Sequence, residues 1–262
     1  MTVWIEGEWL QGGAIPANDR GFLLGDGLFE TIRVSAGKPL RLARHVERLR
    51  KSAKILALAD PFAGIALDET LEEAVERSGL SEAVVRFSVS AGAGQRGLLR
   101  SDGPLTRVLQ VSARPDIPAS VDLATSEIRR SGSAVSTRHK TLSYIDNIAA
   151  RSEARAAGAD MALLRDTADN VSGADCANII WSRGGALHTP SLSCAVLPGT
   201  VRAVLTERVG LQEDEAGLAD VMSADGVFIS NAVMGVVPVR AVDGQELAGN
   251  PDALAILRDA LS

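Results

Sequence analysis

Two prolines, Pro115 and Pro118, interrupt the sequence near its middle and restrict the folds that are open to it. Proline fixes its own φ and lacks a backbone donor, so neither a helix nor a central strand is expected to continue through this segment. Patterns typical of strands and of helices occur on both sides of it. We therefore expect an N-terminal α+β domain over residues 1–114, a linker over 115–120 and a C-terminal domain over 121–262.

Strand and helix patterns alternate irregularly within each half. Period-two alternation and β-branched residues predict N-terminal strands over 3–10 (a hairpin), 29–34, 84–90 and 107–113. Helical spacing covers 42–58 and 68–78, with Asp68 as the predicted N-cap and Gly79 as the stop. C-terminal strands are predicted over 121–128, 161–164, 178–181, 226–230 and 236–242, with helices over 145–157, from about 199 and from 251. Because strict βαβ alternation is missing, the pattern favours α+β over a doubly wound sheet.

Composition excludes several classes of protein. A net charge of -6 argues against a nucleic-acid or anionic-membrane partner. No apolar run approaches the ~20 residues that span a bilayer, and the N-terminus lacks the pattern of a signal peptide. The two cysteines are too few for a disulfide framework. We therefore expect the protein in a reducing compartment, the cytoplasm. The three histidines lie far apart in the sequence, so no metal site is expected.

The segment from Gly92 to Gly97 matches the dinucleotide-binding pattern G-x-G-x-x-G and follows a predicted strand. That pattern needs a helix to open at its end and an acidic residue about 20 positions later. Residues 98–104 are a poor helix start because they contain a glycine and a proline. We interpret the glycines as shaping a loop that presents Arg96.

Lys140 lies between a predicted strand and a predicted helix. Most lysines in such a place are solvated charges, whereas a lysine that forms a covalent link with a carbonyl cofactor must be partly buried. Three other segments could bind an anion. Residues 197–202 open a helix with Gly199 and Thr200, which suits either a phosphate or a simple cap. Arg48 is either a surface cation or a phosphate clamp, and residues 230–234 follow a strand with short polar side chains.

The order of these segments resembles that of the class IV, or fold type IV, pyridoxal-phosphate (PLP) enzymes. The resemblance rests on residues 20–31 (RGFLLGDGLFET), His45-x-x-Arg48-Leu49, Lys140, Asn178 and Leu197-Pro-Gly-Thr200, and it covers nearly the whole chain. The family contains branched-chain and D-amino-acid aminotransferases and aminodeoxychorismate lyase. Residues 84–97 and 229–239 resemble the lyase more, whereas residues 140–147 look closer to the aminotransferases.

The resemblance implies a two-domain α+β fold with the cofactor cleft between the domains, a homodimer, and roles for individual residues. Lys140 would carry PLP and then move the substrate proton. The cofactor would also be held by Arg48, Tyr144, Asn178, Gly199, Thr200, Val201, Asn231 and Ala232. The substrate, a small carboxylate that bears an amine, would be bound by Arg96, whose guanidinium suits a carboxylate, and by Thr31.

One position departs from the family pattern. The family carries a glutamate that pairs with the pyridine nitrogen of the cofactor, and the corresponding residue here is Gly173. A charged partner at that nitrogen tunes the electronics of the ring. Three explanations stay open: Asp175 reaches the nitrogen, water or a hydroxyl such as that of Ser172 bonds an unprotonated nitrogen, or the protein binds PLP and has lost much of its activity.

Three functions follow from the resemblance. The first is a lyase similar to aminodeoxychorismate lyase, which forms 4-aminobenzoate and pyruvate in folate biosynthesis. The second is an aminotransferase for branched-chain or D-amino acids. The third, of another class, is a PLP-binding protein with weak or no catalysis because of Gly173.

Overall fold

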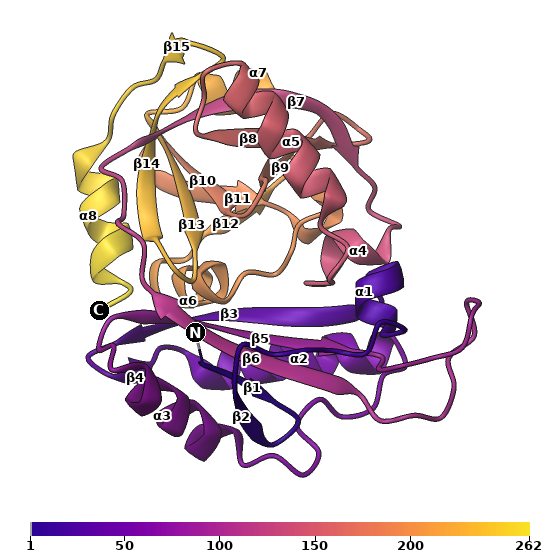
Figure 1. Cartoon of the computed structure of the whole chain (residues 1–262). Coiled ribbons are helices and arrows are strands. Elements are labelled where there is room, and N and C mark those ends of the chain that lie inside the picture. The colour runs from indigo at the N-terminus through magenta and orange to yellow at the C-terminus, as the bar shows by residue number, and fades with distance from the viewer. Residues whose placement is uncertain (1) are drawn as a thin grey trace. The chain divides into compact units, whose positions relative to one another are not determined.

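The computed structural model describes residues 2–262, with side chains from residue 3 on, and divides the chain into two compact units. The first contains the described residues up to Pro115 together with His139–Ser143; the second contains Asp116–Arg138 and Tyr144–Ser262. Each unit combines helices with one sheet (Figure 1), so the chain has the predicted α+β character.

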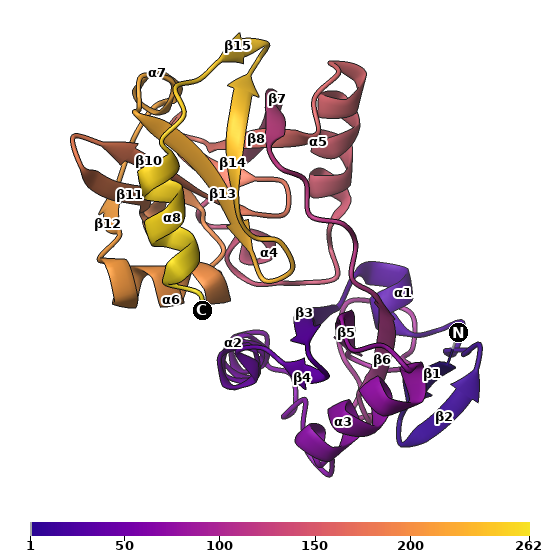
Figure 2. The same cartoon turned by 90° about the vertical axis from the view of Figure 1, so that its left-hand side faces the viewer.

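The first unit is built on a six-stranded antiparallel sheet in the order β2-β1-β6-β5-β3-β4. Its strands are β1 (Thr2–Ile5), β2 (Glu8–Gln11), β3 (Gly27–Ser35), β4 (Lys38–Pro39), β5 (Ala83–Ser90) and β6 (Thr106–Ala113). Helices α2 (Leu42–Ile55) and α3 (Leu67–Ser78) share one apolar cluster with the sheet. A short helix α1 (Arg20–Leu24) precedes β3. Figure 2 shows the sheet close to edge-on with α2 and α3 beside it.

Two details of this unit differ from the sequence prediction. Helix α3 begins at Leu67, and its N-cap is Ala66, which makes no side-chain cap hydrogen bond. Asp68 lies inside the first turn instead, where its negative charge favours the helix dipole. The predicted stop is confirmed, because Gly79 caps α3 in the left-handed conformation.

The second unit contains a nine-stranded sheet in the order β12-β11-β10-β13-β14-β7-β8-β9, with β15 paired to β14. Its strands are β7 (Val121–Arg130), β8 (Met161–Asp166), β9 (Val171–Ala174), β10 (Asn178–Arg183), β11 (Ala186–Pro190), β12 (Gln212–Asp214), β13 (Gly226–Asn231), β14 (Gly235–Val242) and β15 (Gln245–Glu246). The sheet curls around an apolar cluster to which both β9 and β10 contribute.

Helices cover the outside of this curled sheet. Helix α5 (Ile145–Ala156) packs its alanines against β7 and β8. Helices α6 (Thr200–Val209) and α8 (Pro251–Asp259) share a third apolar cluster with β10, β13 and β14. Short helices α4 (Val135–Arg138) and α7 (Leu218–Met222) and a 3-10 turn, η1 (Leu192–Cys194), complete the unit. None of the helices formed by the described residues is long and apolar enough to cross a bilayer.

The segment that carries Lys140 packs with the first unit, although the sequence prediction placed it in the C-terminal domain. The Phe29 N–H donates to the Lys140 carbonyl at 2.9 Å, and the Leu142 N–H donates to the Gly27 carbonyl at 2.9 Å. These bonds make residues 139–143 an extra, short partner of β3. The difference arises because such pairing depends on a strand more than 100 residues away in the sequence.

Candidate active site

Lys140 is held at the start of β3 by contacts on both sides of it. His139 bonds the Ser52 hydroxyl of α2 through Nδ1 at 3.0 Å. The Lys140 ammonium lies 4.1 Å from the centre of the Phe29 ring. Lys140 is only partly exposed, and the ring face attracts a cation. The backbone therefore fixes where the amine can reach.

The same face of β3 carries Thr31, because residues two apart in a strand point the same way. Thr31 pairs across the sheet with Arg86, whose guanidinium carbon lies 3.7 Å from the centre of the Phe29 ring. Phe29, Thr31, Arg86 and Lys140 thus gather at one place. The sequence prediction did not include Arg86; its position opposite Thr31 depends on the pairing of β3 with β5.

Arg48 belongs to a buried charge cluster on the other face of β3. Glu30 follows Phe29 in the strand and so points the opposite way, towards α2. Its carboxylate accepts from Arg48 Nε at 2.8 Å and Nη2 at 2.6 Å, and it lies 2.7 Å from His45 Nδ1. Burial alone would raise the pKa of Glu30, but the charge and hydrogen bonds of Arg48 and those of His45 lower it to about 2. Glu30 therefore stays ionised and fixes the orientation of Arg48.

Arg96 lies in an exposed loop after β5, as predicted. The loop is anchored by the buried Arg20, whose guanidinium donates to the carbonyls of Gly97, Leu98 and Leu99. No helix opens within residues 91–105, so the glycine pattern does not continue into a dinucleotide-binding helix. The loop is shaped by side-chain to backbone hydrogen bonds instead.

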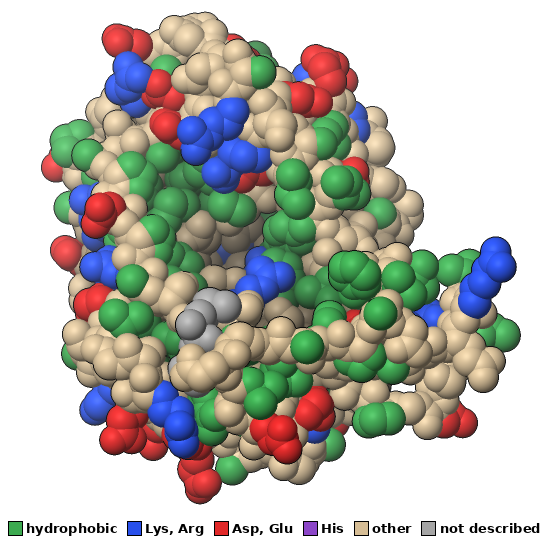
Figure 3. All heavy atoms as spheres, in the orientation of Figure 1, with side chains coloured by type: hydrophobic (Ala, Val, Ile, Leu, Met, Phe, Trp, Pro, Cys, Tyr) green, Lys and Arg blue, Asp and Glu red, His purple; other side chains and the backbone are tan. Residues whose placement is uncertain are grey.

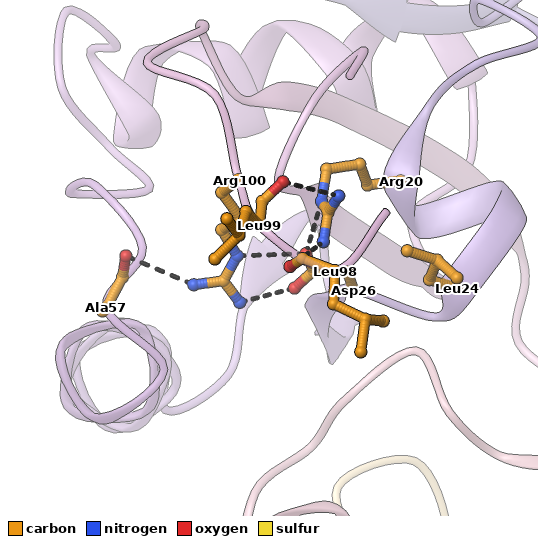
Figure 4. A pocket seen from close by; sticks show the side chains of 7 residues that line it. All are labelled: Arg20, Leu24, Asp26, Ala57, Leu98, Leu99 and Arg100. Carbon is orange, nitrogen blue, oxygen red and sulfur yellow. Dashed lines mark hydrogen bonds and ion pairs between the residues drawn. The ribbon is translucent and has the colours of Figure 1, made fainter. Parts of the chain in front are cut away.

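A cavity of about 590 Å³ opens beside this loop (Figure 4). Asp26 joins its two arginines, accepting from Arg20 Nε at 2.8 Å and from Arg100 Nε at 3.0 Å. The hydrogen bond from Arg100 lowers the pKa of Asp26 despite its partial burial. The cavity is lined by Arg20, Leu24, Asp26, Ala57, Leu98, Leu99 and Arg100, and none of the residues predicted to bind cofactor or substrate is among them.

The second unit gathers the predicted phosphate-binding residues around the start of α6. Gly199 is the N-cap, so the amides of Thr200 and Val201 lie in the first turn, where helix N–H groups have no partner within the helix. A Cβ at position 199 would come 1.9 Å from Asn178 Oδ1, so only glycine fits against that side chain. Asn178 in turn donates to the Leu197 carbonyl at 3.0 Å.

The end of β13 lies next to this helix start. Asn178 pairs in register with Ser230, whose buried hydroxyl has no hydrogen-bond partner among the described residues. Asn231 accepts from the amides of Val233 and Met234 and so shapes the turn that contains Ala232. A buried hydroxyl without a partner beside a helix N-terminus is suited to an anion.

Two residues that the sequence offered as partners of a pyridine nitrogen are engaged elsewhere. Asp175 accepts from Arg151 Nε at 2.6 Å and from the Ala162 amide at 2.8 Å. The buried Ser172 hydroxyl donates to the Ala195 carbonyl at 3.1 Å. The carboxylate of Asp175 ties β9 to α5 and β8, so its hydrogen bonds give no support to the hypothesis that Asp175 replaces the family glutamate.

Arg130 is the charged side chain beside Gly173. Its Nη1 lies 3.9 Å from where a Cβ at position 173 would be, and its Nη2 donates to the Ala174 carbonyl at 3.2 Å. Burial lowers the pKa of Arg130, while the nearby Tyr144, Asp175 and Cys176 act in the opposite direction. The strand predicted from the sequence ends at residue 128, two residues before Arg130, so the sequence pattern did not point to this side chain.

The charges on the visible surface are mixed, with both signs interspersed (Figure 3). Among the described residues, no group of three or more His, Cys, Asp or Glu side chains could hold a metal ion. The first unit offers a partly buried amine and an oriented arginine, and the second unit offers a set of backbone amides.

Comparison with known proteins gives consistent matches along the chain. The family model described as "Amino-transferase class IV" matches residues 27–242. The structure of 4-amino-4-deoxychorismate lyase from Pseudomonas aeruginosa superimposes with a TM-score of 0.87 at 29% identity, covering 99% of this chain and 97% of that one.

Two aminotransferases match over similar lengths. The PLP-bound form of a hypothetical aminotransferase from Mycobacterium tuberculosis has a TM-score of 0.87 at 26% identity, covering 100% of this chain and 98% of that one. D-alanine aminotransferase from Listeria monocytogenes is 26% identical over 89% of this chain and 84% of its own length. Relatives of both activities therefore match at comparable identity.

Proposed function

Because the chain belongs to the class IV aminotransferase family, we propose that it is a PLP-dependent lyase that converts 4-amino-4-deoxychorismate into 4-aminobenzoate and pyruvate. The family makes it an enzyme and PLP its cofactor. What we propose beyond this is that the reaction is that of a lyase, which substrate it takes and which residues carry it out. Its product would serve folate biosynthesis in the cytoplasm.

The phosphate end of PLP fits the residues present. Donors are supplied by the amides of Thr200 and Val201 and by the turn at Asn231 and Ala232. The Ser230 hydroxyl, which has no hydrogen-bond partner among the described residues, supplies another. Gly199 and Asn178 shape this region, since any side chain at 199 would collide with Asn178. We assign these residues, together with the oriented guanidinium of Arg48, to the phosphate.

We assign Lys140 to the aldehyde end of the cofactor. Its neighbours are fixed by backbone bonds to β3, so the amine moves through its own side chain rather than through the loop. When bound, PLP supplies a carbonyl for the substrate amine and a ring that accepts electrons. Tyr144 begins α5 four residues later, and we place it near the phenolic oxygen of the ring.

The observation that carries the choice of lyase is the glycine at position 173, with no acidic side chain in its place. In transamination, the ring must hold the electron pair that is released when the Cα–H bond breaks. In the lyase reaction, Lys140 removes the proton from the carbon that bears the amine, and the neighbouring C–O bond breaks. The C–H electron pair forms a new C=C bond of the aromatic ring, and the C–O pair leaves with enolpyruvate, which becomes pyruvate on protonation. A ring that accepts electrons poorly should therefore slow the lyase reaction less than it slows transamination.

Substrate binding is assigned to the face of β3 that carries Thr31 and to Arg96. Arg96 is exposed and sits in a loop that Arg20 anchors, so it can present a guanidinium to a carboxylate. Arg86 lies beside Thr31 and Phe29 and offers a second cation for a substrate with two carboxylates. The elimination product, 4-aminobenzoate, keeps one of them.

An aminotransferase acting on D- or branched-chain amino acids is the second candidate, favoured by the resemblance of residues 140–147 and by relatives with that activity. Product analysis separates the candidates. We expect 4-aminobenzoate and pyruvate in equal amounts from 4-amino-4-deoxychorismate without an added keto acid. Turnover only with an amino donor and a keto acid would instead support the aminotransferase. Bound PLP without either product would support a binding protein with little catalysis.

We further propose that the protein acts as a homodimer. Phe22, Leu23 and Leu24 of α1 are 71%, 58% and 48% exposed, and Leu98 and Leu99 are 85% and 92% exposed. Arg20 ties these two segments together. Exposed apolar patches of this kind mark interaction sites, and a second copy is the expected partner by analogy with the family. Sedimentation of wild type and of a Leu98→Asp/Leu99→Asp variant tests this: the variant should shift towards monomer.

A further inference from the structure

The backbone at position 173 does not suit the side chain that the family places there. Gly173 has a φ of +153°, a value that residues with a Cβ rarely adopt. A Cβ would also come 3.0 Å from the Ala177 carbonyl oxygen, closer than side chains ordinarily tolerate. The strand β9 is therefore built around glycine here, and the absence of the glutamate is part of the local conformation.

Arg130 reaches this position from two strands away. In the sheet, β8 lies between β7 and β9, with Arg130 paired to Asp166 and Gly173 paired to Leu164. The guanidinium crosses β8, donates to the Ala174 carbonyl and places Nη1 3.9 Å from where a side chain at 173 would start. The charge that the structure brings to this point is positive rather than negative.

The acidic groups around Arg130 are committed to other partners. Asp175 is bound by Arg151 and by the Ala162 amide. Asp166 accepts from the amides of Ala168 and Asn170 and closes its own turn. Among the described residues, Arg130 forms no ion pair, and its Nη2 donates to a neutral carbonyl, that of Ala174. A guanidinium has five N–H donors, so this one has donors left for a ligand.

We propose that Arg130 takes the place of the family glutamate and donates a hydrogen bond to the pyridine nitrogen of PLP, which stays unprotonated. This inference rests on the proposed function, since it requires PLP to be bound with its ring nitrogen at position 173. An arginine is one of the partners that PLP enzymes use at that nitrogen. The guanidinium does not give up its proton, so it stabilises the neutral nitrogen and disfavours the pyridinium.

With Arg130 at the nitrogen, the cofactor ring would be a weaker acceptor of electrons, but the enzyme would keep its activity. The ring without a protonated nitrogen accepts the electrons of a carbanion less well, which penalises amino transfer most. Elimination with an aromatic product depends on it less, because the electron pair of the broken C–H bond goes into the new C=C bond as the C–O bond breaks. Arg130 would therefore act as a determinant of reaction specificity, in contact with the cofactor itself.

Nuclear magnetic resonance of the holoenzyme, loaded with PLP that carries ¹⁵N in its ring, tests the proposal. We expect the wild-type signal at the position of an unprotonated pyridine and unchanged between pH 6 and 8.5. In Arg130→Gln, the nitrogen should titrate at a higher pH and its signal should move towards that of a pyridinium. The matched control is Arg129→Gln, since Arg129 pairs with Asp169 instead; its signal should equal that of wild type.

Each result of this experiment either supports or overturns the proposed role of Arg130. A pyridinium signal in the wild-type holoenzyme would overturn the proposal, and so would an unprotonated nitrogen that does not respond to Arg130→Gln. If Arg130→Gln does not fold, Arg130→Met, which removes every donor of the guanidinium, takes its place, and its nitrogen signal should likewise move towards that of a pyridinium. Failure of the protein to bind labelled PLP at all would instead contradict the proposed function, so the two failures are distinguishable.

Discussion

Arg48 and Arg130 are both largely buried arginines, but Arg48 has a carboxylate as its partner and Arg130 a neutral carbonyl. Arg48 donates twice to the buried Glu30 carboxylate, and that carboxylate has its pKa lowered to about 2. Arg130 donates to the neutral Ala174 carbonyl, and burial lowers its pKa. A cation paired within the protein has a fixed orientation and contributes to stability. A cation held only by a carbonyl contributes little stability and is available to a ligand.

Removing the partner of Arg48 should have the largest effect on folding. In Glu30→Gln, Arg48 loses its carboxylate while it stays largely buried, so we expect the free energy of unfolding to fall by about 3–5 kcal/mol. Urea unfolding measures this. The double variant Glu30→Gln/Arg48→Gln should recover part of the loss, because no charge remains without its partner. A loss below about 1 kcal/mol in the single variant would show that the pair is not essential to the fold.

The same pair predicts how stability depends on pH. The pKa of Glu30 is lowered from 4.5 to about 2 in the folded protein, so its contribution is complete above pH 4.5 and disappears as the pH falls through 2. A shift of this size corresponds to about 3 kcal/mol. Wild type should therefore lose more stability than Glu30→Gln between pH 4.5 and 2. Parallel curves for the two proteins would contradict this account of Glu30.

Asp175, like Arg48, is paired within the protein, and it contrasts with Arg130 in the second unit. Its carboxylate binds Arg151 and the Ala162 amide, so Asp175→Asn should lower the free energy of unfolding by about 2 kcal/mol. We expect the visible spectrum of the bound cofactor to stay unchanged, because this side chain serves the strand and helix around it. A spectrum that shifts in Asp175→Asn while stability stays constant would make Asp175 a partner of the cofactor after all.

The smallest effect on folding is expected at Arg130. Replacing it by methionine removes a desolvated charge and one hydrogen bond to a carbonyl, two changes that oppose each other. We expect the free energy of unfolding without cofactor to change by no more than about 1 kcal/mol. A loss comparable to that of Glu30→Gln would mean that Arg130 stabilises the fold as much as the Glu30–Arg48 pair does, and the contrast between the two arginines would disappear.

Local sequence patterns predicted many of the strands and helices, because apolar residues recur with a period of two in a strand and of about 3.6 in a helix. The alternation around residues 29–34 predicted β3, and Gly79 predicted the end of α3. Gly199 and Thr200 predicted the start of α6. In each case, the residues that decide the structure are neighbours in the sequence.

The arrangement around Gly173 could not be predicted from the sequence in the same way. The absent glutamate is visible in the sequence, which offers Asp175, or water or a hydroxyl such as that of Ser172, in its place. Arg130 was not among them, because it lies 43 positions earlier and meets Gly173 only through the order β7-β8-β9. The packing of residues 139–143 against β3 was missed for the same reason. A charged residue at the end of a buried strand was the one signal that the sequence offered for Arg130.

The central claim is that Lys140 carries the cofactor, and chemical trapping tests it most directly. Purified wild-type protein loaded with PLP should show a visible absorption band, and borohydride should attach the cofactor irreversibly to a peptide that contains Lys140. Lys140→Ala should bind PLP without a trapped product on any lysine and should lose at least about 10²-fold in turnover. A Lys140→Ala protein that keeps the band and yields a trapped peptide would contradict the account.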